Sequence, residues 1–118
     1  MKCTQQFTLR SGVILKNRVL MAPMTITSSQ ANGDVTDDEL AYYHRRAKSG
    51  IGAVITACAA INELASGFKN SIGAESDERI ESLKRLAQSI QSGGAKAILQ
   101  IYHAGRMSNS KLLGAQPV

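Results

Sequence analysis

Hydrophobic residues fall into three continuous apolar runs, with helix-like segments between them. The runs are "RVLMA" (18–22), "GAVITACAAI" (52–61) and "KAILQI" (96–101). Because they show little alternation between apolar and polar positions, they are typical of strands covered on both faces. Pro23 cannot donate to a strand ladder, so the first strand must end there. In front of it, "FTLRSGVILKN" (7–17) predicts a hairpin of two short strands around Ser11-Gly12.

The first helix is predicted to begin at Thr36. Its hydroxyl can cap the helix while Glu39, three residues on, reaches back to form a capping box. Basic residues in the last turn complement the carbonyl end of the helix dipole, and Gly50 ends the helix. The apolar positions at helical spacing are Leu40, Tyr43 and Ala47.

The second helix is predicted to begin after Ser76 as its cap and to stop at Gly93-Gly94. A Glu81/Arg85 pair is expected on its polar face. Its apolar face is formed by Ile80, Leu83, Leu86, Ala87 and Ile90. Residues 62–75 are polar and mixed, and the residues after 101 read as a loop with no further element.

Helices that alternate with apolar strands predict βαβ units and a parallel sheet, so the fold class is α/β. The carboxyl ends of parallel strands meet at one edge, where ligands bind in folds of this class. The segments after Ala22, Cys58 and Ile101 should therefore lie together. Three strands and two helices leave edge strands unpaired and one face poorly covered, so residues 1–118 are interpreted as the beginning of a larger barrel.

Composition narrows the function classes. The chain of 118 residues has the length of one domain, is 43% hydrophobic and 19% charged, and carries a net charge of +5. The basic residues are scattered and no nucleic-acid-binding pattern is present, so nucleic acid is not expected as a partner. A basic binding module stays open as an alternative, which the salt dependence of nucleic-acid affinity would test.

The two cysteines, Cys3 and Cys58, cannot form a disulfide framework, and no metal-binding pattern accompanies them. Cys58 lies in an apolar run and is expected to be a buried, reduced thiol. No apolar stretch reaches the ~20 residues needed to cross a membrane. Since no signal peptide is evident, a cytoplasmic location is expected and no membrane partner.

Three segments resemble, in order and spacing, the amino-terminal part of the Old Yellow Enzyme family. These are "LKNRVLMAPMT" (15–25), "ANGDVTDDELAYYHRRAKSGIGAVIT" (31–56) and "ILQIYHAGR" (98–106), and the resemblance runs from Phe7 to the last residue. Members of that family are NADH:flavin oxidoreductases that bind FMN in a (β/α)8 TIM barrel. The resemblance implies that residues 1–118 are an amino-terminal fragment of such a barrel, without its remainder. It also implies FMN as cofactor, NAD(P)H as reductant and an electron-poor alkene or similar small molecule as substrate.

The resemblance implies five cofactor-binding residues. Pro23, Met24 and Thr25 match the end of the first strand, which lies against the flavin, and Thr25 would donate a hydrogen bond to the flavin O4 and raise the reduction potential. Cys58 matches a small residue beside the ring. Gln100 stands among apolar residues, where an unsatisfied amide costs about 1–3 kcal/mol. It can match the donor and acceptor groups of the flavin pyrimidine edge, or it can bond to a neighbouring strand or water.

No catalytic residue is assigned within residues 1–118. In the family a His/His or His/Asn pair, a tyrosine proton donor and an arginine on the FMN phosphate all come later in the chain. His103 and Arg106 are expected to order the loop after the third strand, and His44 to be a solvated helix residue. An alternative is a non-catalytic fragment that assembles with the rest of the barrel on a separate chain. A full-length relative is expected to be a homo-oligomer.

Overall fold

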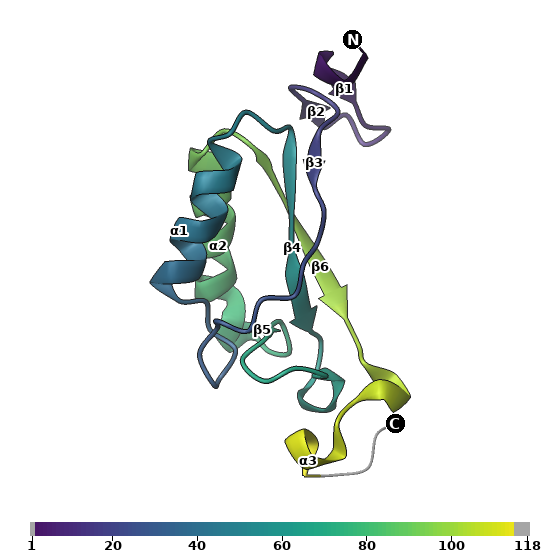
Figure 1. The fold of residues 1–118 in the computed structure, drawn as a ribbon, viewed down its shortest axis with the longest axis vertical. Helices are drawn as coiled ribbons and strands as arrows, with labels where there is room; N and C mark the ends of the chain where they lie inside the picture. The colour runs from purple at the N-terminus through teal and green to yellow at the C-terminus, as the bar shows by residue number, and fades with distance from the viewer. Residues whose placement is uncertain (1, 115–118) are drawn as a thin grey trace.

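A computed structural model describes residues 2–114 and places two helices on one side of a parallel sheet (Figure 1). The α-helices are α1 (Asp37–Ala47), α2 (Ile80–Ser92) and α3 (Ser110–Leu113). The strands are β1 (Phe7–Thr8), β2 (Ile14–Leu15), β3 (Leu20–Met21), β4 (Ala53–Ala60), β5 (Ile72–Gly73) and β6 (Lys96–Tyr102). Short 3-10 helices are η1 (Lys2–Thr4), η2 (Glu63–Ala65), η3 (Asp77–Arg79) and η4 (Gly105–Met107).

Strand β4 is the centre of the sheet. It pairs in parallel with β6 along most of its length, with β3 at its start and with β5 at its end. Residues 53–54 pair with both β3 and β6, and residues 59–60 with both β5 and β6, so β3 and β5 lie on the side of β4 opposite to β6. The predicted α/β class with a parallel sheet is therefore confirmed.

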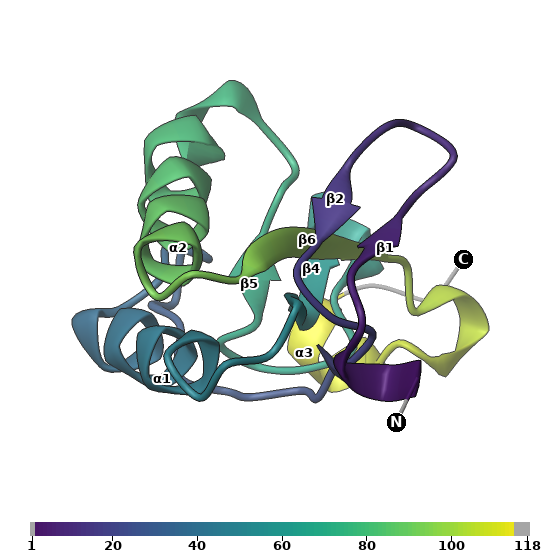
Figure 2. The same cartoon turned by 90° about the horizontal axis from the view of Figure 1, so that it is seen from above.

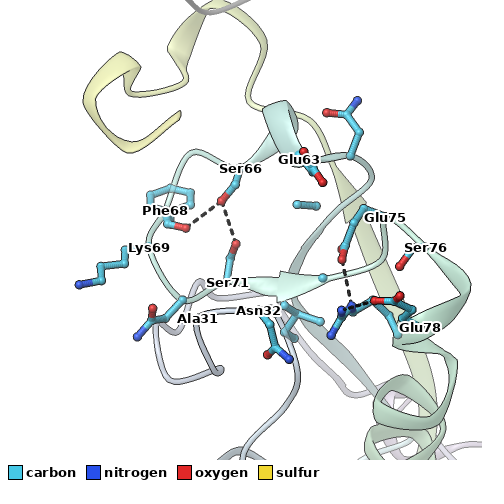
Figure 3. A pocket seen from close by; sticks show the side chains of 17 residues that line it. Ala31, Asn32, Glu63, Ser66, Phe68, Lys69, Ser71, Glu75, Ser76 and Glu78 are labelled. Atoms are coloured by element: carbon cyan, nitrogen blue, oxygen red, sulfur yellow. Dashed lines mark hydrogen bonds and ion pairs between the residues drawn. The ribbon is translucent and has the colours of Figure 1, made fainter. Parts of the chain in front are cut away.

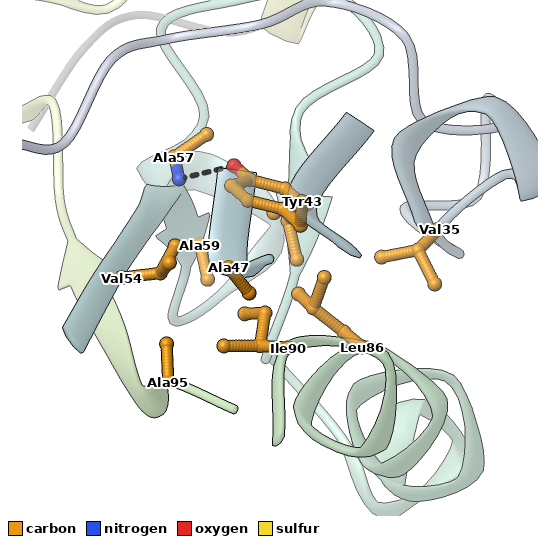
Figure 4. Packing of buried hydrophobic residues seen from close by; sticks show 10 residues of the cluster. Val35, Tyr43, Ala47, Val54, Ala57, Ala59, Leu86, Ile90 and Ala95 are labelled. Atoms are coloured by element: carbon orange, nitrogen blue, oxygen red, sulfur yellow. Dashed lines mark hydrogen bonds between the residues drawn. The ribbon is translucent and has the colours of Figure 1, made fainter. Parts of the chain in front are cut away.

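Helices α1 and α2 lie side by side against the same face of β4 and β6 (Figure 2). Their apolar faces close the main core, in which Tyr43, Ala47 and Ile90 are fully buried (Figure 4). Neither helix covers the outer part of the edge strand β6, so Leu99 and Ile101 stay 39% and 67% exposed. This agrees with the expectation of a sheet that is only partly covered.

The local signals at the amino-terminal end and in α1 are confirmed. Strands β1 and β2 pair antiparallel, and Gly12 in their connection has φ +86°, a conformation that glycine adopts at no steric cost. The hairpin lies near the amino ends of β3 and β4 (Figure 1). Helix α1 has the predicted capping box: the Thr36 hydroxyl accepts from the Glu39 N–H, and the Glu39 carboxylate accepts from the Thr36 N–H.

Several sequence-based details are corrected. Strand β3 spans only Leu20–Met21, residues 72–73 of the supposedly irregular segment form β5, and η4 and α3 follow the last strand. Ser76 makes no side-chain capping bond, and α2 begins after η3 at Ile80, which is 58% exposed and not part of the apolar face. Arg85 does not pair with Glu81; it binds Asp37 of α1 at 2.6 Å because the two helices lie next to each other.

Candidate functional site

The predicted convergence of three strand ends is present. Thr25, in the segment after β3, places its Oγ1 3.7 Å from the Sγ of Cys58 on β4. Cys58 is in turn the direct register partner of Gln100 on β6. Cys58 is buried, Gln100 is half-buried, and Thr25 is exposed. Pro23 and Met24 precede Thr25 in the same extended segment and are exposed, Met24 by 49%.

A β-bulge in β4 decides which way Cys58 faces. Ile55 pairs with Ile98 and Cys58 pairs with Gln100, so two residues of β4, Thr56 and Ala57, stand opposite the single residue Leu99. Val54, Ala57 and Ala59 belong to the core under the helices, whereas strict alternation from Val54 would have placed residues 56 and 58 there. The bulge therefore turns Cys58 to the face away from the helices.

Two hydroxyls hold the bulge. The Ala57 N–H donates to the Tyr43 hydroxyl at 2.7 Å (Figure 4), and the Gln100 N–H donates to the Thr56 Oγ1 at 3.2 Å. The Thr56 hydroxyl itself donates to the Ala57 carbonyl at 2.9 Å. Burial raises the pKa of Tyr43 to about 12, although the hydrogen bond from Ala57 opposes the shift, so this hydroxyl stays protonated. Neither Tyr43 nor Thr56 was predicted to act at the site. The only signal in the sequence was Thr56, a threonine inside an otherwise apolar run.

The side-chain amide of Gln100 fits a ligand-facing role. Within residues 2–114 the backbone N–H of Gln100 is bonded, but its carboxamide has no hydrogen-bond partner. Its register partner Cys58 and the nearby Thr25 leave this edge lined by an amide, a thiol and a hydroxyl. An amide supplies both a donor and an acceptor, which suits the adjacent donor and acceptor groups of a flavin pyrimidine edge.

Contacts of His103 and His44 show structural roles, and the role of Arg106 stays a prediction. His103 accepts the Gly105 N–H on its Nδ1 at 2.8 Å, which confirms its loop-ordering role, and Arg106 is exposed. His44 is not simply solvated: its Nδ1 lies 3.0 Å from the Ser89 carbonyl oxygen and 3.2 Å from the Ser92 Oγ of α2. His44 therefore helps to join the two helices.

A cavity of about 860 Å³ lies beside β5 and the loop that follows β4 (Figure 3). None of the predicted flavin contacts lines it. At its border the Arg79 guanidinium lies 2.6 Å from Asp34, 2.9 Å from Glu75 and 3.2 Å from Glu78. Because Arg79 is already paired with Asp34, Glu75 and Glu78, and because no predicted flavin contact lies here, this cavity is a weaker candidate site than the edge at Thr25, Cys58 and Gln100.

Arg79 also sets the ionisation of its partner Asp34. Partial burial alone would raise the pKa of Asp34, but the hydrogen bonds from Arg79 and Asn32 and the positive charges of Arg79 and Arg85 lower it overall. The hydrogen bond to Asp34 raises the pKa of Arg79 although burial opposes the shift, and the negative charges of Asp34, Glu75 and Glu78 raise it further. The pair fastens the loop before α1 to the start of α2.

Two negative findings apply to the described part of the chain. No group of three or more histidine, cysteine, aspartate or glutamate side chains in residues 2–114 is arranged to hold a metal ion. Among the helices of the same residues, none has the length and apolar character needed to span a membrane.

Comparison with known proteins establishes the family. Residues 5–117 match the model of the NADH:flavin oxidoreductase / NADH oxidase family, so the chain belongs to that family. It is 47% identical over 115 residues to an NADH:fumarate oxidoreductase of Klebsiella pneumoniae, covering 97% of this chain and 12% of that protein. It is 41% identical over 114 residues to a probable NADH-dependent flavin oxidoreductase of Bacillus subtilis, covering 97% of this chain and 30% of that protein.

Solved structures agree. The Old Yellow Enzyme homologue from Zymomonas mobilis superposes with a TM-score of 0.90 at 26% identity, over 99% of this chain and 32% of that one. Morphinone reductase in complex with tetrahydroNAD gives a TM-score of 0.85, also at 26% identity, over 99% of this chain and 30% of that one. The chain thus spans about a third or less of these relatives, and the predicted amino-terminal portion of a TIM barrel is confirmed.

Proposed function

We propose that this chain supplies one wall of the FMN site in an oxidoreductase that moves hydride from NAD(P)H, by way of FMN, to an electron-poor alkene or a similar acceptor. One observation carries the proposal: Thr25, in the segment after β3, contacts Cys58 of β4, which stands opposite Gln100 of β6 toward the carboxyl ends of these parallel strands. Ligands of α/β barrels bind at that edge. Membership in the flavin oxidoreductase family supports FMN as the ligand.

Each residue has a definite task in this proposal. Thr25 donates a hydrogen bond to the flavin O4, and Gln100 offers its unpartnered amide to the pyrimidine edge. Cys58 fills the space between them, and Pro23 and Met24 present an exposed, strand-ending surface to the ring. When bound, FMN supplies the ring that accepts and donates hydride.

The names of two relatives support the substrate class. They act on fumarate and on acrylate, both of which carry a carbon–carbon double bond conjugated to a carboxylate, and they are 47% and 43% identical to this chain over nearly its whole length. Residues 1–118 contribute cofactor contacts, so the groups that polarise and protonate the alkene must come from elsewhere in the assembled enzyme. A homo-oligomeric assembly and a cytoplasmic location remain expectations from the sequence.

A graft tests the proposal. Residues 1–118 replace the matching segment of the Bacillus subtilis relative, and FMN binding is measured by fluorescence quenching. Gln100→Met removes the amide at similar size and should weaken FMN binding roughly tenfold, because the flavin edge loses its partner. Gln88→Met, on the exposed side of α2, is the matched control and should bind as the unsubstituted graft does.

A folded graft that binds no FMN would refute the proposal, and so would equal affinities for the Gln100 and Gln88 variants. The isolated chain of 118 residues should bind FMN only weakly, since the phosphate contact expected of the family lies outside it. Tight binding with NAD(P)H oxidation by the isolated chain would contradict that part of the reasoning.

A further inference from the structure

We propose that Tyr43 and Thr56 are positioning residues of the flavin site, because their hydroxyls hold the β-bulge that turns Cys58 toward the cofactor and places it opposite Gln100. This inference rests on the proposed function. It concerns two side chains that do not line the predicted contact surface: Tyr43 comes from the helix layer and is fully buried, and Thr56 is 2% exposed inside β4.

The bulge has a specific consequence because of where it lies. In a regular ladder continuing from the Ile55–Ile98 pair, Gln100 would stand opposite Ala57, and Cys58 opposite Ile101 on the helix side. With the bulge, Cys58 stands opposite Gln100 and reaches Thr25. One extra residue immediately before Cys58 thus brings the three proposed flavin contacts together.

Two backbone N–H groups at the bulge donate to the two hydroxyls. Ala57 is 1% exposed, and its N–H points to the helix layer, where the Tyr43 hydroxyl accepts it at 2.7 Å. The Gln100 N–H donates to the Thr56 hydroxyl at 3.2 Å. The Thr56 hydroxyl is therefore bonded directly to the backbone of the residue whose side chain is proposed to bind the flavin.

Loss of the Tyr43 hydroxyl takes the partner from the buried Ala57 N–H, and loss of the Thr56 hydroxyl removes a hydrogen bond from the Gln100 N–H. Both changes cost free energy in the bulged arrangement. β4 can relieve that cost by adopting a regular register. Cys58 then moves away from Thr25, and Ala57 takes the place opposite Gln100. A defect in the bulge should therefore change FMN affinity and the midpoint potential of the bound FMN, and not only the stability of the fold.

The experiment uses two substitutions that remove a hydroxyl and two matched controls. Tyr43→Phe and Thr56→Val remove the hydroxyls at nearly constant shape. Tyr42→Phe removes a hydroxyl from the neighbouring tyrosine of the same helix, and Thr56→Ser keeps the hydroxyl. In the 118-residue chain, amide hydrogen exchange at Ala57 and Gln100 is followed by NMR. In the graft, FMN affinity and the midpoint potential of the bound FMN are measured.

Tyr43→Phe should speed amide exchange at Ala57 by roughly tenfold or more, and Thr56→Val should do the same at Gln100. In the graft, both variants should bind FMN roughly tenfold more weakly and shift the midpoint potential of the bound FMN. Tyr42→Phe and Thr56→Ser should keep the unsubstituted values. Faster exchange together with unchanged affinity and potential would overturn the positioning role, as would unchanged exchange. A folded unsubstituted graft without FMN would instead refute the proposed function itself, and this inference with it.

Discussion

The contact between the ends of α1 and α2 depends on the absence of a side chain at Gly93. Gly93 is the C-cap of α2 and has φ −76° and ψ −7°, a conformation that alanine adopts without strain. A Cβ built there would lie 2.5 Å from the Ala47 Cβ and 3.0 Å from the His44 carbonyl oxygen. Gly93→Ala therefore tests steric packing between the helices, because the substitution causes no backbone strain.

The expected magnitude follows from these distances. Carbon atoms in contact prefer a separation of about 3.5–4.0 Å, so the helices must separate by roughly 1 Å. Overpacking of this kind costs about 1–3 kcal/mol. The alanine also restricts the unfolded chain, which returns about 0.4–1 kcal/mol. We expect a net loss of about 1–2 kcal/mol in the free energy of unfolding, measured by urea denaturation with circular dichroism.

A double-mutant cycle isolates the cause. Ala47→Gly removes the methyl group that clashes, so the double variant should be more stable than the sum of the single changes by at least ~1 kcal/mol. Gly50→Ala is the control, because a Cβ at Gly50 meets no atom within 4 Å and its φ of +94° makes the cost a backbone cost. The free-energy changes of Gly50→Ala and Ala47→Gly should add without coupling. A coupling below about 0.5 kcal/mol for Gly93 and Ala47 would refute the steric reasoning.

Three further predictions concern the ion pairs and the flavin. Arg79→Met should lower the free energy of unfolding by about 1–3 kcal/mol, because it leaves the half-buried carboxylates of Asp34 and Glu75 without their partner. Glu78→Gln should have almost no effect on stability, because the Glu78 side chain is 82% exposed. The folded-state pKa of Asp34 is depressed, so its stabilisation is present above its usual pKa of 3.8 and is lost as the pH falls through the lower folded value. Asp34→Asn should therefore flatten acid unfolding, and an unchanged acid transition would argue against this pair. In the graft, Thr25→Val should lower the FMN midpoint potential by roughly 20–60 mV, the two-electron equivalent of ~1–3 kcal/mol for a lost hydrogen bond; a spectroelectrochemical titration that shows no shift would remove Thr25 from the site.

The alternation of strands and helices and the convergence at one edge could be predicted because both depend on patterns that the chain repeats. Apolar runs and helical periodicity identify βαβ units, and parallel strands necessarily direct their carboxyl ends to the same side. That logic predicts that Thr25, Cys58 and Gln100 lie together. The 3.7 Å contact between the Thr25 Oγ1 and the Cys58 Sγ agrees with it, as does the pairing of Cys58 with Gln100.

The missed features depend on contacts between distant segments. A buried parallel strand has no alternation, so apart from the single polar residue Thr56 nothing in "AVITACAA" indicates that its facing changes at Thr56 and Ala57. Strand β5 forms within a polar segment because residues 72–73 pair with the end of β4. Gly73 also donates to the Gly33 carbonyl at 2.9 Å, in a backbone approach too close for a side chain. Arg85 had an intrahelical partner by spacing alone, but the neighbouring helix offered Asp37.

The core and the proposed site share one residue, and this couples stability to function. Tyr43 packs between Ala47 and the strand residues as part of the apolar cluster, while its hydroxyl accepts the one N–H that the bulge exposes to the helix layer. The position of that hydroxyl depends on how closely α1 approaches β4. Since Gly93 of α2 lies against Ala47 of α1, we expect a change in this helix contact to affect Cys58 through the bulge. The helix layer is therefore expected to influence the facing of the proposed flavin wall as well as covering the sheet.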